Sequence, residues 1–313
     1  MKLWAPLLLA AACHAAPADF NGRWNIKVEN EPRNRAWWLE VTGAGTPGIK
    51  GRFVGAPGGQ MDAIPAIRVD GQELVWEFER AYSRGQPKSK GVYRARLEGG
   101  ALRGSFQVDG RPASKLVFAG KRAPVIKDVD DGSWKPGKTI ELFNGRDLAG
   151  WVSRMPGRPV QWRVENGLLR NHEGAADIVS TASYWNFRLH AEYRVGKGSN
   201  SGIGLRGRYE VQILEDHGRA LDTHSNGTIY SRMVPAVAAS KPAGEWQTFD
   251  ITLIGRTVTV VLNGKTVIDR KEIEGLTAMA NDPDEDQPGP VSLQGDHGPV
   301  DFKKITVTPF IRP

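Results

Sequence analysis

Hydrophobic and polar residues alternate along many short segments of the chain, and this period of two is typical of β-strands. In the first third of the chain the alternating segments are 38–41, 74–78, 92–97, 105–108 and 115–118. Turn pairs such as Asp70-Gly71 and Asp109-Gly110 separate them. Strands of this length and spacing predict a small β-barrel or β-sandwich over residues 17–122.

A second unit is predicted over residues 139–313, after a segment at 123–138 that carries prolines, glycines and charges without periodicity and so indicates a linker. The clearest strands of the second unit are 187–195, 209–214, 250–254, 257–262 and 265–268. Asn263-Gly264 predicts a type I′ hairpin turn between the last two. No stretch shows a helical period with caps. We therefore expect an all-β protein whose C-terminal unit is a jelly-roll sandwich of two antiparallel sheets.

Residues 1–16 are typical of an export signal, with Lys2 before a short apolar run and small residues after it. Cys13, the only cysteine, follows leucines and alanines as in a lipoprotein processing site, but Ala10 stands where leucine is usual. Removal of Cys13 and a lipid anchor on it stay open as alternatives. We expect an exported protein that is periplasmic, anchored to the outer membrane or secreted, and that has no structural disulfide.

The net charge of +7 lies almost entirely in the first unit, where residues 17–122 hold 18 Lys and Arg against 11 Asp and Glu. These charges are dispersed and form no basic run. We interpret them as a solvated face rather than a surface for an anionic partner, and expect no nucleic-acid partner. The chain has no Gly-x-Ser-x-Gly elbow, phosphate-binding loop or dinucleotide fingerprint, so no nucleotide cofactor is expected. The strand pattern of conventional two-carboxylate glucanases is also absent.

One predicted strand has an unusual composition for the interior of a sheet. Val211 and Ile213 would point to one face, and Glu210 and Gln212 to the other, with Arg206 nearby. Carboxylate, amide and guanidinium groups can each make paired hydrogen bonds with sugar hydroxyls. From the spacing alone, however, a solvated polar face of an antiparallel sheet is the simpler interpretation.

A second polar cluster follows the predicted strand at 291–294. Leu293 would be buried and Gln294 exposed, and His297 lies in a glycine-rich turn where the backbone can approach a ligand closely. An imidazole can move protons near neutral pH. A turn histidine without a function is the alternative.

Two acidic segments share some features with metal sites. Residues 215–224 contain three carboxylates and two imidazoles, but lack the His-x-x-x-His or His-x-His spacing of metal ligands. Asp282, Asp284 and Asp286 alternate as in a calcium loop, but Gln287 stands where such a loop needs glycine. Both segments are interpreted as solvated loops.

The second unit resembles the 3-keto-disaccharide hydrolase family over about residues 139–310. Residues 141–151, Glu-Leu-Phe-Asn-Gly-Arg-Asp-Leu-Ala-Gly-Trp, match the family's opening, Leu-Phe-Asn-Gly-x-Asp-Leu-x-Gly-Trp. Further matches follow in the family's order: 187–194, Asn200-Ser-Gly202 with Arg206, 209–214, Gly227-x-x-Tyr230, Gly244-Glu-Trp246, Asn263-Gly264, and Leu293-Gln294 with His297-Gly298. The resemblance does not extend to residues 1–130.

The resemblance implies a concanavalin A-like β-sandwich that acts on glycosides whose sugar carries a ketone at C3. Such a ketone acidifies the hydrogen on C2, so a base can remove it and the group at C1 can leave by β-elimination. Water can add back afterwards, which makes the net result a hydrolysis. The residues carried over by the resemblance are Arg206, Glu210, Gln212, Tyr230, Gln294 and His297.

Roles for these residues are hypotheses. Glu210 or His297 would be the base, and Tyr230 would orient the sugar or protonate the leaving oxygen. Arg206, or a metal near Glu210, would stabilise the enolate. Asn200, Gln212, Gln294 and Glu192 would bind the substrate.

A divalent metal is left open, with Glu210, Glu215 and His297 as candidate ligands. Glu215 stands where members of the family commonly have aspartate, which puts the geometry of such a site in doubt.

Three functions remain open at this point: an enzyme that cleaves 3-keto-glycosides, a lectin-like module that only binds sugar, and a scaffold for protein contacts. The N-terminal unit is expected to be accessory to the second unit. Its Trp24, Trp37, Trp38 and Trp76 could stack on sugars, but packing in a core is the favoured interpretation.

Overall fold

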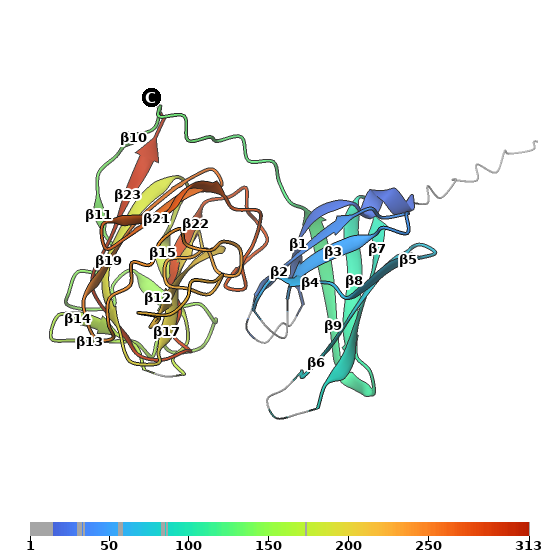
Figure 1. Ribbon diagram of the computed structural model, residues 1–313, viewed down its shortest axis with the longest axis horizontal. Helices are drawn as coiled ribbons and strands as arrows, with labels where there is room; N and C mark the ends of the chain where they lie inside the picture. Colours follow the sequence, from blue (N-terminus) through green and yellow to red (C-terminus); the bar gives the residue numbers. More distant parts are fainter. Residues whose placement is uncertain are drawn as a thin grey trace, which may run out of the picture.

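The computed structural model describes residues 15–29, 33, 35–55, 59–82, 85, 87–172 and 174–312. It is an all-β structure, as predicted, with two β units joined by an extended segment (Figure 1). A short 3-10 helix, η1 (Pro17–Phe20), precedes the first strand. Cys13 and most of the predicted export signal lie outside the described residues. Within the described part, no helix is long and apolar enough to cross a membrane.

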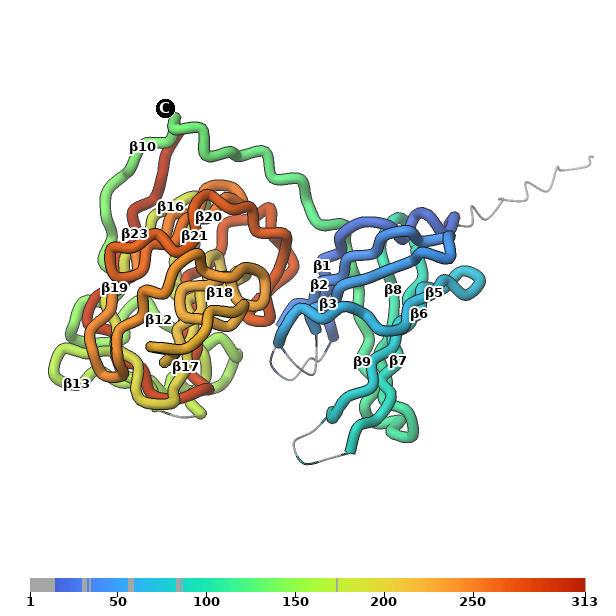
Figure 2. The backbone as a smooth tube through the Cα atoms, viewed as in Figure 1, coloured from blue at the N-terminus to red at the C-terminus, as the bar shows by residue number. Residues whose placement is uncertain are grey.

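The N-terminal unit is one antiparallel sheet of nine strands in the order β4-β3-β2-β1-β9-β8-β7-β6-β5. The edge strands β4 and β5 are consecutive in the chain, so Ile64 and Pro65 connect the two edges and the sheet curls around its own core (Figure 2). The strands are β1 (Gly22–Val28), β2 (Ala36–Thr42), β3 (Lys50–Val54), β4 (Asp62–Ala63), β5 (Ala66–Asp70), β6 (Glu73–Arg80), β7 (Ser89–Glu98), β8 (Ala101–Val108) and β9 (Arg111–Arg122).

Aromatic side chains fill the core of this unit. Trp76 stacks on Tyr93 with ring centroids 5.0 Å apart, and Trp37 meets Tyr93 edge-on at 5.9 Å. Each such ring removes a large apolar area from water, and the edge and offset geometries are the ones that ring quadrupoles favour. Trp24, Trp37 and Trp76 belong to this core, so they are structural rather than sugar-stacking residues.

The C-terminal unit is a sandwich of two antiparallel sheets with a continuous hydrophobic core between them. The large sheet has the order β13-β14-β23-β16-β19-β20-β21, with β10 and β11 also paired to β23. Its strands are β10 (Lys135–Pro136), β11 (Ile140–Glu141), β13 (Arg163–Glu165), β14 (Leu168–Arg170), β16 (Phe187–Val195), β19 (Gln247–Ile254), β20 (Thr257–Leu262), β21 (Lys265–Glu272) and β23 (Val300–Ile311). Asn263 and Gly264 both have positive φ, as the predicted type I′ turn requires.

The smaller sheet has five strands in the order β12-β15-β22-β17-β18. They are β12 (Trp151–Ser153), β15 (Ile178–Tyr184), β22 (Gly289–Leu293), β17 (Asn200–Leu205) and β18 (Tyr209–Leu214). Residues 123–134 run outside both sheets, whereas β10, within the predicted linker, already pairs with β23. Asp128 anchors the connection by accepting hydrogen bonds from Trp185 Nε1 at 2.6 Å and Asn186 Nδ2 at 2.8 Å.

A buried polar cluster joins the two units. Asn25 on β1 is fully buried and donates to Glu285 Oε2 at 2.7 Å and to the Pro283 carbonyl at 3.0 Å. Glu285 is also fully buried, and it accepts from Tyr209 Oη at 2.7 Å and Arg256 Nη2 at 2.9 Å. A buried carboxylate is tolerated only when it is paired and hydrogen-bonded in this way.

A smaller apolar contact lies beside this cluster. Trp38 on β2 is fully buried against Leu276 and Ala280, and the Arg232 guanidinium lies 4.1 Å from the centre of its ring. The backbone N–H of Ala36 donates to the Ala280 carbonyl at 2.9 Å. The start of β2 is therefore fixed against the C-terminal unit.

We predict that Asn25→Ala weakens the junction of the two units. Removing a buried donor to a carboxylate costs about 1.5–3 kcal/mol, so denaturant unfolding should show a loss of stability of this size. Gln107→Ala, which removes an amide on β8 that has no partner among the described residues of the other unit, is the control. Equal stability of the two variants would contradict the structural importance of this cluster.

Candidate functional site

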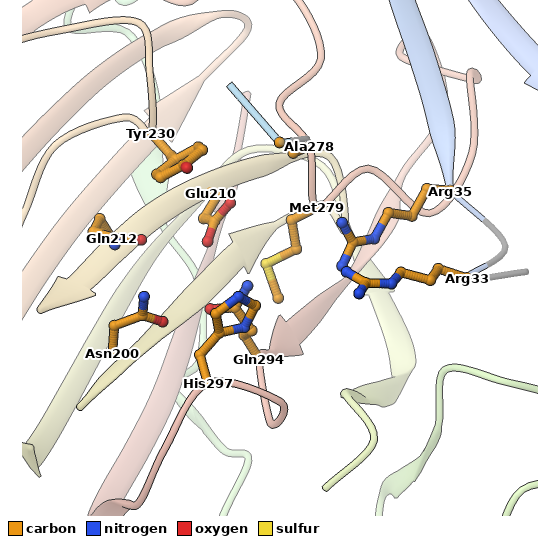
Figure 3. Close-up of a pocket in the computed structure, with 11 residues that line it drawn as sticks. Arg33, Arg35, Asn200, Glu210, Gln212, Tyr230, Ala278, Met279, Gln294 and His297 are labelled. Atoms are coloured by element: carbon orange, nitrogen blue, oxygen red, sulfur yellow. The ribbon is translucent and has the colours of Figure 1, made fainter. Parts of the chain in front are cut away.

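A pocket of about 320 Å³ lies on the face of the five-stranded sheet that points away from the sandwich core (Figure 3). Most of its walls are polar. It is lined by Arg33, Arg35, Gly59, Asn200, Glu210, Gln212, Tyr230, Ala278, Met279, Gln294 and His297. The pocket thus unites several residues that the sequence motifs singled out, including both polar side chains of β18.

Glu210 lies at the centre of this pocket. On β18 the side chains of Tyr209, Val211 and Ile213 enter the core, so those of Glu210 and Gln212 point to the opposite face. Both are only 3% exposed, which corrects the simpler interpretation of a solvated face. Gly202 on the neighbouring β17 makes room for the carboxylate, since a Cβ there would lie 2.6 Å from Glu210 Oε1.

Burial governs the ionisation of Glu210. Removal from water, reinforced by the charges of Asp177 and Asp296, raises the pKa of this carboxyl to about 7, against the opposing influence of Arg35 and His297. No described side chain donates a hydrogen bond to the carboxylate, whereas the backbone N–H of Glu210 donates to Thr277 Oγ1 at 3.0 Å. A carboxylate with a pKa near neutrality can take up a proton at working pH.

Amide side chains flank the carboxylate. The loop after β22 is held to β17, because Ser201 Oγ donates to the Gln294 carbonyl at 2.7 Å and the Gln294 N–H donates to the Gly202 carbonyl at 2.9 Å. Within the described residues, Asn200 Oδ1 and Gln294 Oε1 are buried and accept no hydrogen bond. Buried acceptors without a donor are costly. They suit a ligand that brings several hydroxyl donors.

Tyr230 reaches the pocket from a segment that extends the sheet beyond β18. Its backbone N–H donates to the Glu210 carbonyl at 3.0 Å, and Ile229 forms a bridge with Val211. Burial, and then the charge of Glu210, raise the pKa of the Tyr230 phenol to about 12, so it remains protonated.

His297 lies in the turn between β22 and β23. Asn171 Nδ2 holds this turn by donating to the carbonyls of Gly295 and Gly298, each at 2.9 Å. The imidazole hydrogen-bonds through Nδ1 to the Asp296 carboxylate, and this bond raises the pKa of His297 above its ordinary value. The protonated form is thereby favoured.

Two arginines of the N-terminal unit complete the pocket, and neither was expected there. Arg33 and Arg35 precede β2, and their side chains extend from its start toward the side of the pocket that holds Glu210 and His297 (Figure 3). The Arg-x-Arg pair lies in a connection between two strands, outside the segment that carries the family motifs. The prediction of an accessory N-terminal unit did not anticipate this contribution.

Arg206 does not reach the pocket, which corrects its predicted role. It follows the far end of β17 from Asn200 and is fully buried. Its guanidinium lies 3.8 Å from the centre of the Trp185 ring and donates to the Trp185 carbonyl at 2.6 Å and to Asn186 Oδ1 at 3.0 Å. These contacts are structural.

Glu192 is also outside the site. On β16 the side chains of Ala191 and Tyr193 enter the core, so Glu192 lies on the outer face of the large sheet, on the other side of the sandwich from the pocket. There it pairs with Lys303 at 2.7 Å. The alternation along β16 therefore excludes contact with a ligand bound near Glu210.

The carboxylates and imidazoles of the described residues do not gather into a metal site. Glu215 lies beyond the end of β18 and pairs with Arg219 at 3.3 Å, apart from Glu210 and His297. Across the described residues, no three carboxylate, imidazole or thiol groups come close enough to hold one ion.

Comparison with known proteins identifies the C-terminal unit. Residues 138–308 match the family model described as the 3-keto-alpha-glucoside-1,2-lyase-like domain. A curated relative, the 3-keto-disaccharide hydrolase of Bacteroides thetaiotaomicron, is 26% identical over 167 residues, which cover 42% of this chain and 57% of that protein. The match thus spans little more than half of the relative's length.

Solved structures are similar to part of the chain. A Parabacteroides distasonis protein described as a candidate glycosyl hydrolase is 28% identical, with a TM-score of 0.48, covering 59% of this chain and 91% of that one. A carbohydrate-binding module of Bacillus subtilis is 13% identical, with a TM-score of 0.35, covering 50% of this chain and 94% of that one. The family resemblance expected from the motifs is confirmed by the family model, and the chain belongs to the 3-keto-alpha-glucoside-1,2-lyase-like domain family.

Proposed function

We propose that the protein is an exported enzyme that cleaves 3-keto-glycosides, with Glu210 as the base that removes the proton at C2. The observation that carries this proposal is a buried carboxylate with a pKa of about 7 inside a pocket lined by amides. Family membership and the relative named as a 3-keto-disaccharide hydrolase support the substrate class. Export rests on the signal-like composition of residues 1–16.

Glu210 suits the role of base better than His297. A base must be unprotonated and close to the carbon acid, and Glu210 lies at the floor of the pocket with no hydrogen bond to its carboxylate from the described side chains. The bond from His297 to Asp296 favours the imidazolium, which has no free electron pair. His297 is therefore assigned to proton donation.

The reaction follows from these assignments. Glu210 takes the proton from C2, and the electron pair of the C–H bond moves into the enolate of the C3 ketone. The enolate collapses to a double bond between C1 and C2, and the bond from C1 to the glycosidic oxygen breaks. His297 or Tyr230 supplies a proton to that oxygen. Addition of water across the double bond returns hydrogen to C2 and places hydroxyl on C1, which completes a net hydrolysis.

The amide side chains of the pocket bind the sugar. Asn200 Oδ1 and Gln294 Oε1 are acceptors placed for sugar hydroxyls, and Gln212 adds an amide on the same face as Glu210. The same groups would also suit a lectin-like protein that binds sugar without reaction. Conversion of a 3-keto-glycoside to product would distinguish the enzyme from the lectin-like protein.

We predict that Glu210→Gln strongly slows turnover of a 3-keto-glucoside while the amides still bind it. Loss of a general base costs roughly 10²–10⁴-fold in kcat. Proton NMR should show a glycal-type intermediate with the unaltered enzyme and none with the variant. Glu245→Gln, an exposed carboxylate in the same unit, is the control. Undiminished turnover by Glu210→Gln would remove Glu210 from the mechanism, and sugar binding without turnover by the unaltered protein would favour the lectin-like function.

We also predict that Glu210→Gln stabilises the protein at alkaline pH. The folded-state pKa of about 7 exceeds the ordinary 4.5, so the native state holds this proton more tightly than the unfolded state and loses stability as pH rises from about 4.5 to 7. The full cost is on the order of 3 kcal/mol above pH 7. Denaturant unfolding at about pH 8 should favour the variant, and the difference should disappear near pH 4. If the variant and the unaltered protein differed in unfolding free energy by the same amount at both pH values, burial would not be destabilising the ionised carboxylate.

A further inference from the structure

The wall of the pocket that faces Glu210 belongs partly to the N-terminal unit. Arg35 directly precedes β2, whose first residue, Ala36, is bonded to the Ala280 carbonyl at 2.9 Å. Ala278 and Met279, just before Ala280, line the pocket beside Arg33 and Arg35. The same junction that fixes β2 to the C-terminal unit therefore fixes the position of Arg35.

Arg35 lies among charged side chains at this wall. Burial and the neighbouring charges of Arg154 and Arg33 lower the pKa of Arg35, against the opposing influence of Asp177 and Asp296. Arg154 is paired with Asp177 at 3.3 Å, and Arg33 lies 3.8 Å from Asp296. Arg33 and Arg154 each have an acidic partner and yet still lower the pKa of Arg35, so an anion that enters the pocket beside Arg35 would be stabilised by its charge.

The proposed reaction produces such an anion. When Glu210 removes the proton at C2, negative charge develops on the oxygen at C3, whereas the oxygen at C1 must receive a proton. Tyr230 and His297 hold transferable protons. A guanidinium is a permanent cation that does not act as an acid, so it suits the C3 oxygen and not the leaving group.

We propose that Arg35 stabilises the enolate oxygen at C3, so that the N-terminal unit is part of the active site. This inference rests on the function proposed above. The C2–H bond breaks, its proton goes to Glu210 and its electron pair ends on the C3 oxygen beside the guanidinium, so no oxidant or other reactant is needed. Arg35 thereby takes the role expected of Arg206, which the structure buries against Trp185.

The test compares Arg35→Ala, Arg35→Lys and the control Arg103→Ala, an exposed arginine on β8 of the same unit. Turnover of a 3-keto-glucoside gives kcat and KM separately, and exchange of the C2 hydrogen with D₂O reports enolate formation directly. Thermal unfolding establishes that each variant is folded. If Arg35→Ala fails to fold, Arg35→Lys still tests the role, because it retains the charge but lacks the guanidinium group.

Arg35→Ala should lose roughly 10²–10³-fold in kcat and in the C2 exchange rate, with little change in KM. Added guanidinium should restore part of this loss, Arg35→Lys should be intermediate, and Arg103→Ala should match the unaltered enzyme. Turnover and exchange by folded Arg35→Ala within about threefold of the unaltered enzyme would overturn this role for Arg35 and leave Glu210 as the base. If the unaltered protein neither turns over nor exchanges the 3-keto-glucoside, the proposed function fails together with this inference.

Discussion

A buried carboxyl group is the constraint on which the site depends. Glu210 is 3% exposed, and Gly202 on the adjacent strand leaves room for its carboxylate. Burial raises the pKa of Glu210 to about 7, so the group can exchange a proton near neutrality. Keeping the ionised carboxylate out of water lowers the stability of the folded protein, and the same burial gives Glu210 the raised pKa that suits a general base.

Residues of both units hold the strand that carries the Glu210 carboxyl in place. Tyr209, directly before Glu210, donates to Glu285, and Glu285 accepts in turn from Asn25 of the other unit. Met61 N–H donates to Ser231 Oγ at 2.8 Å, next to Tyr230. Hydrogen bonds across the junction thus involve the chain neighbours of both Glu210 and Tyr230, and the same junction brings Arg33 and Arg35 to the pocket.

Local patterns predicted the all-β class, the hairpin at Asn263-Gly264 and the shared face of Glu210 and Gln212, because alternation and turn chemistry act within a few residues. Burial of that shared face could not be predicted, since it depends on chain segments distant in the sequence. The predicted roles of Arg206 and Glu192 were wrong for other reasons. Arg206 lies in the turn after β17, and Glu192 lies on the outer face of the large sheet, away from the pocket. Arg35 reaches the site only through the docking of the two units, and no local pattern encodes that contact.

The most direct test of this account is the titration of the Glu210 carboxyl itself, followed by ¹³C NMR on protein labelled at glutamate and assigned with Glu210→Gln. A single signal that disappears in the variant and titrates with a midpoint near pH 7 is the result that the structure predicts. A midpoint in the ordinary acidic range of about 4 to 5 would mean that water or a permanent partner reaches the carboxylate. Glu210 would then lack the property from which its role as base has been derived.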